Sequence, residues 1–525
     1  MLPQISMTVK GVVLLIAAVY AFAALLRRED AEWVKGAPLK VFVGMFLLGM
    51  WGHSVWVLYL AIIIAIPLLS RSKADAAAIY MVTIIAVPPL YYKVAVGSIY
   101  LMPFTKYLFA MAGLAIAIAS KSGPRGRLGS RFDIPVLLVI ILELIAERDP
   151  SITELMRQEL PILLNIALPY FLVSRALTTS EDLRRFVLAI ALGGFVMAIV
   201  ATVEAHTHWL IYKQMETYLH LGSQTNAYQQ VRGGMLRAPG SFPESTSLGN
   251  FLALAAVAIL ALRHSFASNA KWYAAIGALA IGVFAPNSRG ALLGLGAGWL
   301  LFDFYRKNWP GLFTKLGLAG GAYLLLLTAA QFSNYSAELV GKGQATKAST
   351  EYRVLLLHRG LEEIRKHPFG TNIKTALNNL EDIRQGQHII DLVNGYISYG
   401  LTSGYAGMVG LFLVFATLCA AMLSARRNLV VDPMMRDLAA FVFGVSGFLI
   451  IISAFTSFGG EGSTAFYMVA AVGSSIYALR RTALGRAANP AAAAVPTYGP
   501  PIRGQILADR EAARGRRPKP SMEMS

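Results

Sequence analysis

Long apolar runs separated by short basic loops are the dominant feature of this sequence, and they constrain its fold strongly. A helix needs about 20 mostly apolar residues to cross a bilayer, with a range of roughly 17–25. The chain is 56% apolar and 14% charged, whereas about a quarter of the residues in soluble domains are charged. Water cannot accommodate so much apolar surface, so the sequence predicts an all-α polytopic membrane protein over residues 1–480.

One apolar region is too long for a single upright span. Residues 39–70 would form a helix about 48 Å long, whereas the apolar core of a bilayer is about 30 Å thick. The interruption "MWGHSVW" near the middle predicts a break, which makes this region either one tilted span or a hairpin of two. The expected total is therefore about 14 or 15 spans. The other predicted spans are 8–26, 76–91, 103–120, 133–146, 160–174, 186–203, 246–262, 272–286, 290–304, 315–332, 396–423, 438–456 and 464–479.

Lysine and arginine in the short loops orient these spans. By the positive-inside rule, such loops face the cytoplasm across a bacterial inner membrane. Because the net charge of +18 is spread through these loops, it argues against a nucleic-acid partner. The tail 481–525, rich in Ala, Pro and Arg, is predicted to be disordered and cytoplasmic, while the side of the N-terminus stays open. The loops that carry the signal are 121–131, 175–185, 263–271, 306–315 and 426–436.

The opposite face, which would be periplasmic, carries the longest loops. The largest of them is the segment 333–395. Its stretch "EYRVLLLHRGLEEIRKHP" places Leu355, Leu356 and Ile364 at helical spacing, which predicts an amphipathic helix at the membrane surface.

The sequence predicts no metal and no cofactor. His206 and His208 have a spacing compatible with zinc, but no cysteine or third histidine lies near them. The phosphate-binding pattern G-x-x-x-x-G-K-[ST] is absent from the sequence, so no nucleotide is expected. Cys419 is the single cysteine, which excludes a disulfide framework within one chain.

Two arginines lie on the periplasmic side, where the positive-inside rule does not place them. Arg237 opens "RAPGSFPESTSLGNFLA", and Arg289 lies in "APNSRGALLGLGAG". A guanidinium group is a two-pronged donor for phosphate, and Gly240 and Gly290 would let backbone approach a ligand. The start of a span adds free N–H groups. The pair therefore predicts a pyrophosphate site just outside the hydrocarbon, with snorkelling arginines as the alternative.

Three sequence elements in a fixed order carry a family resemblance. They are an R-x-x-G-x-F element at Arg237, an S-R-G element at Arg289, and "HIIDLVNGYISYGLTSGYAGMVGL" after the long loop. Together they resemble the O-antigen ligase and polymerase superfamily, and "LPYFLVSRALTTSEDLRRFVLAI" resembles its exopolysaccharide-polymerase branch. The chain departs from the ligase pattern at one position. Ligases usually carry His directly before the Asn of the loop element, whereas this chain has Val393 there, preceded by His388 and Asp391.

The resemblance implies glycosyl transfer between lipid-linked saccharides. The donor would be a glycan on polyprenyl pyrophosphate, and the acceptor a hydroxyl of another lipid-linked repeat unit or, in ligases, of the lipid A core. Arg237 and Arg289 would stabilise the charge that grows on the leaving pyrophosphate. A flippase and a chain-length regulator would be the partners of a polymerase.

Transfer to a hydroxyl also needs a proton acceptor. The candidates are Asp391, His388 and Glu244, in that order. Each has a structural alternative: Asp391 could cap the following span, His388 could be a solvated loop residue, and Glu244 could pair with its neighbouring arginine. Asn394 and Tyr396 would orient sugar or backbone.

Three functions compete on these grounds. The Asp391 departure and the "PYFLVSR" segment favour a polysaccharide polymerase over a ligase. A lipid-oligosaccharide transporter is the alternative from another class, and it would need charged groups along a path through the membrane. Nearly all charges lie at span ends, with Glu143 as the main exception, which disfavours transport.

Overall fold

The computed structural model describes residues 2–96, 99–122, 132–146, 160–221, 231–232, 234–384, 390–426, 432–456 and 463–488. The chain divides into two units, Met1–Leu479 and Arg480–Ser525. The first unit contains the apolar helices and all the residues of the candidate site.

Each apolar run contains a helix, which confirms the helical core of the prediction. The region 39–70 forms two helices rather than one, with the predicted break between them. Its break falls at residues 52–54, where the Ser54 hydroxyl accepts a hydrogen bond from the Trp56 N–H and caps the second helix. The helices are α1 (Leu2–Leu25), α3 (Ala37–Trp51), α4 (Val55–Leu69), α5 (Lys73–Ala86), α6 (Lys106–Ser120), α7 (Asp133–Ala146), the helix Leu160–Ala176 that includes α9 (Leu168–Ala176), α10 (Ser180–Thr207), α12 (Ser245–Ala261), α13 (Asn269–Gly282), α14 (Arg289–Arg306), α15 (Trp309–Ala329), α19 (Gly395–Ala425), α20 (Pro433–Ile452) and α21 (Ser463–Ala488).

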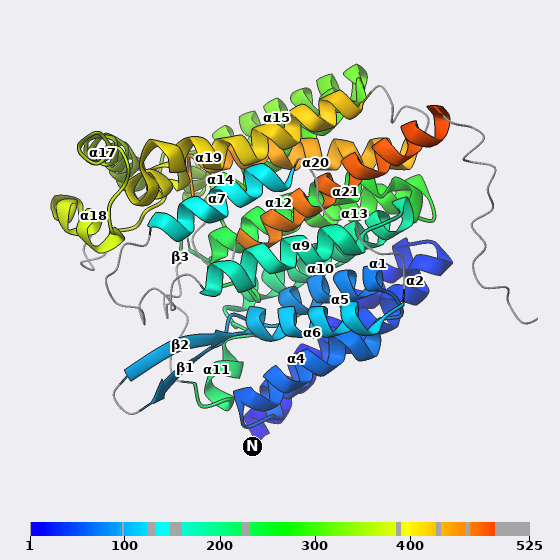
Figure 1. Ribbon diagram of the computed structural model, residues 1–525. Coiled ribbons are helices and arrows are strands. Elements are labelled where there is room, and N and C mark those ends of the chain that lie inside the picture. The colour runs from blue at the N-terminus through cyan, green and yellow to red at the C-terminus, as the bar shows by residue number, and fades with distance from the viewer. Residues whose placement is uncertain are drawn as a thin grey trace, which may run out of the picture. The chain divides into compact units, whose positions relative to one another are not determined.

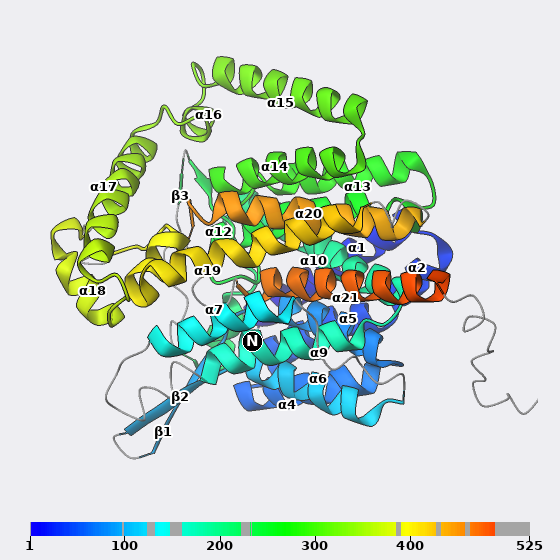
Figure 2. The same cartoon turned by 45° about the horizontal axis from the view of Figure 1, so that its top comes forward.

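Six helices among the described residues are long and apolar enough to cross a membrane. They differ in how much protein surrounds them: 83% of the most apolar part of α10 is buried, and none of that part of α15 is. Helix α10 is therefore central, while α15 stands at the edge of the first unit (Figure 2). The six are Pro3–Leu25, Arg28–Trp51, Ser180–Thr207, Trp309–Ala329, Gly395–Ala425 and Pro433–Ile452.

The expectation of an all-α fold is wrong at two places, where short antiparallel hairpins occur. The first pairs β1 (Tyr91–Val96) with β2 (Ile99–Thr105), and the second pairs β3 (Val231–Arg232) with β4 (Met235–Leu236). Helix α5 ends at Ala86 because Pro88 and Pro89 cannot continue it. The β-branched and aromatic residues that come next favour strands. The predicted spans 76–91 and 103–120 include only the outer ends of the first hairpin, and no predicted span covers the second.

The predicted amphipathic helix is present as α17 (Gln344–Lys366) between α16 (Asn334–Leu339) and α18 (Ile373–Asn379). Its buried side chains Leu356 and Ile364 pack with α18 and α19, whereas Leu355 is 45% exposed. Helix α17 is thereby fixed to the protein through a small hydrophobic core of its own.

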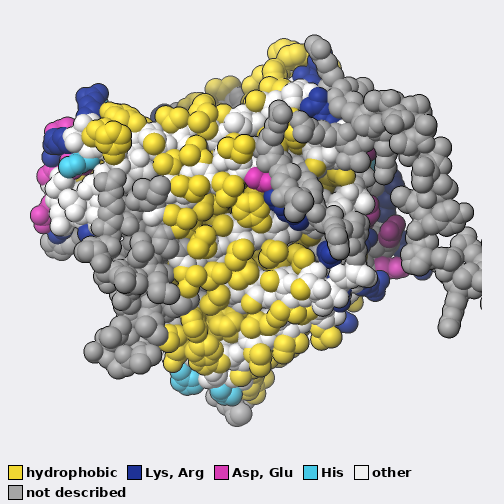
Figure 3. Space-filling model, viewed as in Figure 1, with side chains coloured by type: hydrophobic (Ala, Val, Ile, Leu, Met, Phe, Trp, Pro, Cys, Tyr) yellow, Lys and Arg dark blue, Asp and Glu magenta, His cyan; other side chains and the backbone are white. Residues whose placement is uncertain are grey.

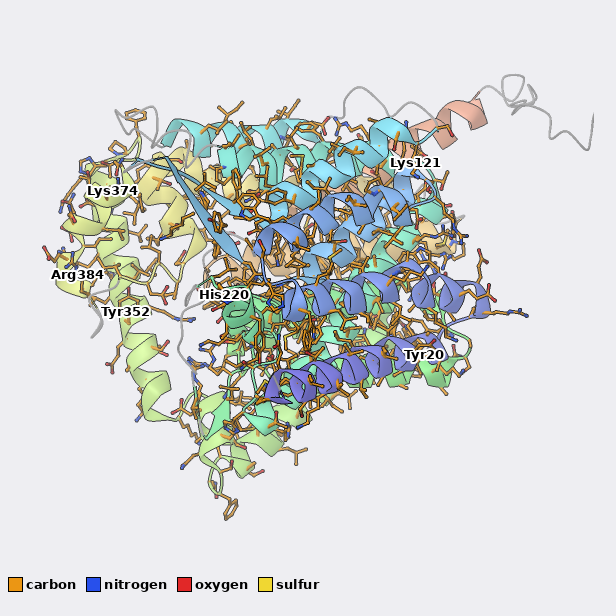
Figure 4. The ribbon with its side chains drawn as sticks, turned by 90° about the horizontal axis from the view of Figure 1, so that it is seen from below. Tyr20, Lys121, His220, Tyr352, Lys374 and Arg384 are labelled. Atoms are coloured by element: carbon orange, nitrogen blue, oxygen red, sulfur yellow. The ribbon has the colours of Figure 1, made fainter. Side chains whose placement is uncertain are left out.

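The helices have two chemically different ends (Figure 1). The loop end carries the β1–β2 hairpin, α17 and α18; the basic end carries Lys121 and the links from α9 to α10, α12 to α13 and α14 to α15. Figure 4 shows Lys121 and Tyr20 toward one end and Tyr352 and Lys374 toward the other. Leu26 pairs with Phe266 in the link from α12 to α13. Helix α1 therefore ends at the basic end and begins at the loop end.

Apolar side chains form a wide band between these two ends (Figure 3). On the face shown, lysines, arginines and acidic residues gather in the upper part of the loop end and at the basic end. The band between them is nearly free of charge. This pattern is typical of a protein that crosses a bilayer.

Candidate functional site

The turn that carries Arg237 is held by hydrogen bonds to three separate elements. The Ala238 N–H donates to the Ala285 carbonyl between α13 and α14 (3.3 Å). The Gly240 N–H donates to Glu204 on α10 (2.9 Å), and the Ser241 hydroxyl donates to the Ile85 carbonyl on α5. Gly240 has φ of 56°, a left-handed conformation that favours glycine. The R-x-x-G-x-F element is therefore a fixed turn leading into α12.

Arg289 is the first residue of α14, and helix packing brings it to the same end as the turn. Ser288 caps α14 by accepting from the Ala291 N–H (3.4 Å). Helices α12 and α14 approach closely, since a Cβ on Gly249 would lie 2.8 Å from the Ala291 Cβ. Gly290 likewise lies against Ile452 of α20.

A cavity of about 800 Å³ opens at this place in the loop end. It brings together Arg237 and Arg289, as the sequence predicted, and adds Arg232 and Arg353, which the sequence reasoning missed. Asp391 lies in its wall as well. The cavity is lined by Val231, Arg232, Arg237, Thr246, Ser288, Arg289, Gly290, Ala348, Ser349, Tyr352, Arg353, Asp391, Val393, Ile452, Phe455 and Thr456.

Neutral oxygen atoms accept hydrogen bonds from two of the guanidinium groups. Arg237 donates to the Pro286 carbonyl (3.3 Å) and the Thr246 hydroxyl (3.1 Å). Arg232 donates to the Asn287 carbonyl (3.4 Å). Within the described residues, the buried Nε of Arg353 has no hydrogen-bond partner, and the Arg289 side chain forms neither a hydrogen bond nor an ion pair.

Burial and the closeness of the arginines to one another lower their pKa values. Burial and then the charge of Arg232 lower the pKa of Arg237 to about 10, with Glu244 opposing the shift. Burial also lowers the pKa of Arg353, with Asp391 opposing. Guanidinium groups stay protonated at neutral pH, so the cavity is a concentrated positive site suited to a multiply charged anion.

Three carboxylates act on the arginines: Glu338, Asp391 and Glu244. Burial raises the pKa of Asp391, and Arg353 opposes that shift. Burial and then the charge of Asp391 raise the pKa of Glu244. Asp391 and Glu244 also contact solvent, so either can exchange a proton with water. Tyr352 fixes the backbone of Asp391, since its hydroxyl accepts from the Asp391 N–H (2.9 Å) and donates to the Asp391 carbonyl (3.0 Å).

One known family matches part of the chain. Residues 274–412 match the family model described as O-antigen ligase. This match supports the resemblance to the O-antigen ligase and polymerase superfamily. No curated protein matches the chain. The members of this family are glycosyl-transferring enzymes.

The match to the O-antigen ligase family spans only part of the cavity. It includes Arg289, Arg353 and Asp391, whereas Arg232 and Arg237 precede it. The cavity thus joins the matched segment to the earlier turn, which the ordered sequence elements had already linked to this superfamily.

Three predicted residues lie outside the cavity lining and contact backbone. Gly240 is buried in its turn. Asn394 caps α19 by accepting from the Ile397 N–H (3.1 Å), and Tyr396 donates to the Ile450 carbonyl (2.8 Å). Because Asn394 makes the cap, the alternative that Asp391 caps this helix is wrong.

The other two candidate bases have different outcomes. His388 lies outside the described residues. Glu244 immediately precedes α12. It is not ion-paired with Arg237 in the described part of the chain, although the two charges interact at longer range.

The two missed arginines had weak sequence signals. Arg353 lies in the quoted stretch "EYRVLLLHRG", and Arg232 precedes Arg237 by five positions. Both arginines lie on the expected periplasmic side, where the positive-inside rule predicts few basic residues. Only the fold of the long loop brings Arg353 back over α14.

Proposed function

We propose that this protein is a glycosyltransferase that polymerises polyprenyl-pyrophosphate-linked repeat units at the periplasmic face of the inner membrane. The observation that carries the proposal is the cluster of four arginines with Asp391 around one cavity, at the mouth of apolar helices. A pyrophosphate at the end of a lipid chain matches both features, because its charge suits the arginines and its lipid suits the apolar band.

The proposed topology rests on the two ends of the molecule. The basic end would face the cytoplasm by the positive-inside rule, so the loop end and its cavity would face the periplasm. Helix α1 begins at the loop end and the region 39–70 contributes two helices. These features support the higher expected count, about 15 crossings with a periplasmic N-terminus and a large periplasmic loop over 333–395.

The orientation can be tested by labelling single cysteines in a Cys419→Ser background. Thr375→Cys lies on an exposed position of α18, and Ala270→Cys lies at the basic end on an exposed position of α13. With the outer membrane permeabilised, an impermeant thiol reagent should label the first variant in whole cells. It should label the second only after the inner membrane is opened. The reverse pattern would overturn the orientation and the proposed function with it.

The chemistry assigns each group one task. The acceptor hydroxyl oxygen attacks the anomeric carbon of the donor sugar, a new C–O bond forms, and the bond from that carbon to the pyrophosphate oxygen breaks. The leaving polyprenyl pyrophosphate takes the electron pair, and the arginines stabilise its charge from fixed positions. The hydroxyl proton passes to the Asp391 carboxylate, which burial makes a better base than an ordinary aspartate.

Two residues in the wall of the cavity favour polymerase activity over ligase activity. Val393 lines it where ligases usually carry histidine, and Asp391 lines it two residues earlier. A carboxylate thus replaces the imidazole near the arginines. Transfer to the lipid A core is the second candidate function, because the family match is to O-antigen ligase.

Purified protein in liposomes, supplied with lipid-linked repeat units, tests the proposal directly. A ladder of longer lipid-linked glycans should form without added nucleotide. Transfer only to an added lipid A core would identify a ligase. Movement of intact donor across the bilayer without any new glycosidic bond would identify a transporter and refute the proposed enzyme.

A further inference from the structure

Glu204 is a buried carboxylate that accepts hydrogen bonds from two backbone N–H groups. It lies near the end of α10 and is fully buried. One oxygen accepts from the Ile211 N–H (2.9 Å), and the other accepts from the Gly240 N–H (2.9 Å). Within the described residues it has no ion pair, so two backbone N–H groups alone compensate the cost of burying this group.

The second of these bonds reaches the turn that presents Arg237. Gly240 comes three residues after Arg237 and has a positive φ of 56°. Its N–H donates to Glu204 of α10, and neither residue lines the cavity. The carboxylate is therefore a fixed point for the turn outside the ligand cavity.

Arg237 needs such a fixed point because its surroundings repel it. The charges of Arg232, Arg353 and Arg289 all act on it and lower its pKa. The Pro286 carbonyl and the Thr246 hydroxyl orient the guanidinium, and the charge of Glu244 opposes the repulsion from the other arginines. A flexible turn would let the guanidinium move away from the other cations while the cavity is empty, and donor binding would then have to restore the arrangement.

We infer that Glu204 is a positioning residue, which holds the turn so that Arg237 stays directed at the pyrophosphate site. The inference rests on the proposed function. A carboxylate suits this task because both of its oxygens accept. A glutamine would direct its NH₂ group at one of the two N–H donors and lose that hydrogen bond.

The test is a double-mutant cycle on binding of inorganic pyrophosphate to the purified full-length protein. Glu204→Gln should weaken binding by about 10-fold, and Arg237→Ala by about 10–100-fold. If Glu204 acts through Arg237, the double variant should bind no more weakly than Arg237→Ala alone. Losses that multiply would overturn the inference.

Two further variants separate positioning from general damage. Asp75→Asn changes an equally buried acid, whose oxygens accept from Trp33 Nε1 and the Arg71 N–H. It should bind pyrophosphate like the wild type, and a loss equal to that of Glu204→Gln would overturn the inference. Gly240→Ala keeps the N–H but strains the turn at its φ of 56°, so it disturbs the same link from the turn side. It should weaken binding even if Glu204→Gln fails to fold.

The cycle also distinguishes this inference from the function on which it rests. If Arg237→Ala binds pyrophosphate as tightly as the wild type, the proposed arginine site fails. If Arg237→Ala weakens binding and neither Glu204→Gln nor Gly240→Ala does, only the positioning role fails.

Discussion

The two ends of the helix bundle differ in the partners of their lysine and arginine side chains. At the basic end, four partly buried cations have acidic partners: Arg184 contacts Asp30 (2.5 Å), and Arg175 contacts Asp133 (2.6 Å). The same holds for Arg306 with Asp437 (3.0 Å) and Lys315 with Asp303 (2.8 Å). At the loop end, four arginines converge on one cavity, where the carboxylates interact with them only at longer range among the described residues.

This difference separates structural charge from functional charge. A partly buried cation with a carboxylate beside it is neutralised and joins helices. A group of partly buried cations that outnumbers the carboxylates around it raises the energy of the empty protein, and an anionic ligand relieves that cost. The balance of charge around an arginine therefore predicts its role better than its burial does.

The largest expected effect comes from removing an arginine of the cavity. Arg237→Ala and Arg289→Ala should each reduce glycan transfer by about 10²–10³-fold, because each removes a donor from the leaving group. Lysine at either position should restore little, since it lacks the two-pronged contact. The measurement is the rate of polymer formation per mole of folded protein.

An arginine of the basic end supplies the matched control for this comparison. Arg175→Ala leaves Asp133 without this ion pair and should lower the thermal midpoint, while the folded protein keeps its transfer rate. Wild-type polymer from either cavity variant, or an inactive but stable Arg175→Ala protein, would show that local charge balance does not separate the two roles.

The next effect is on turnover alone. Asp391→Asn keeps the shape of the side chain but removes its basicity, so the rate constant should fall by about 10²-fold while donor binding stays near normal. His388→Gln should cost less. These values come from initial rates at several donor concentrations. Full activity of Asp391→Asn beside an inactive His388→Gln would make the histidine the base, and full activity of both would direct attention to Glu244.

How far the sequence predicts this molecule depends on the range of each interaction. Apolar runs predict helices because burial of a span is a local property, and the basic loops mark one end for the same reason. Arg237 and Arg289 could be found because each lies beside a predicted span start. The β1–β2 hairpin escaped prediction because most of it lies in the gap between two predicted spans, which a count of apolar residues leaves unassigned.

The residues that escaped prediction depend on contacts between distant segments. Arg353 enters the cavity only because α17 packs onto α18 and α19. Glu204 and Gly240 are 36 positions apart, and neither residue alone indicates the hydrogen bond between them. Asn394 rather than Asp391 caps α19, because the identity of the cap depends on the exact residue at which the helix begins.

The smallest expected effect concerns Arg353, and it tests whether the carboxylate and the arginines act as one site. Asp391 must be ionised to accept a proton, so activity should fall as the pH is lowered through its pKa. Burial raises that pKa and Arg353 lowers it. Arg353→Gln removes the stabilising charge, so the pKa rises and the acid limb of the rate profile should move to higher pH. Pyrophosphate binding should weaken by about 10-fold at the same time.

Arg359→Gln, on the exposed part of the same helix and paired with Asp382, should change neither the limb nor the binding. An Arg353→Gln profile that overlays the wild type would place the base outside the reach of this arginine and separate Asp391 from the anion site.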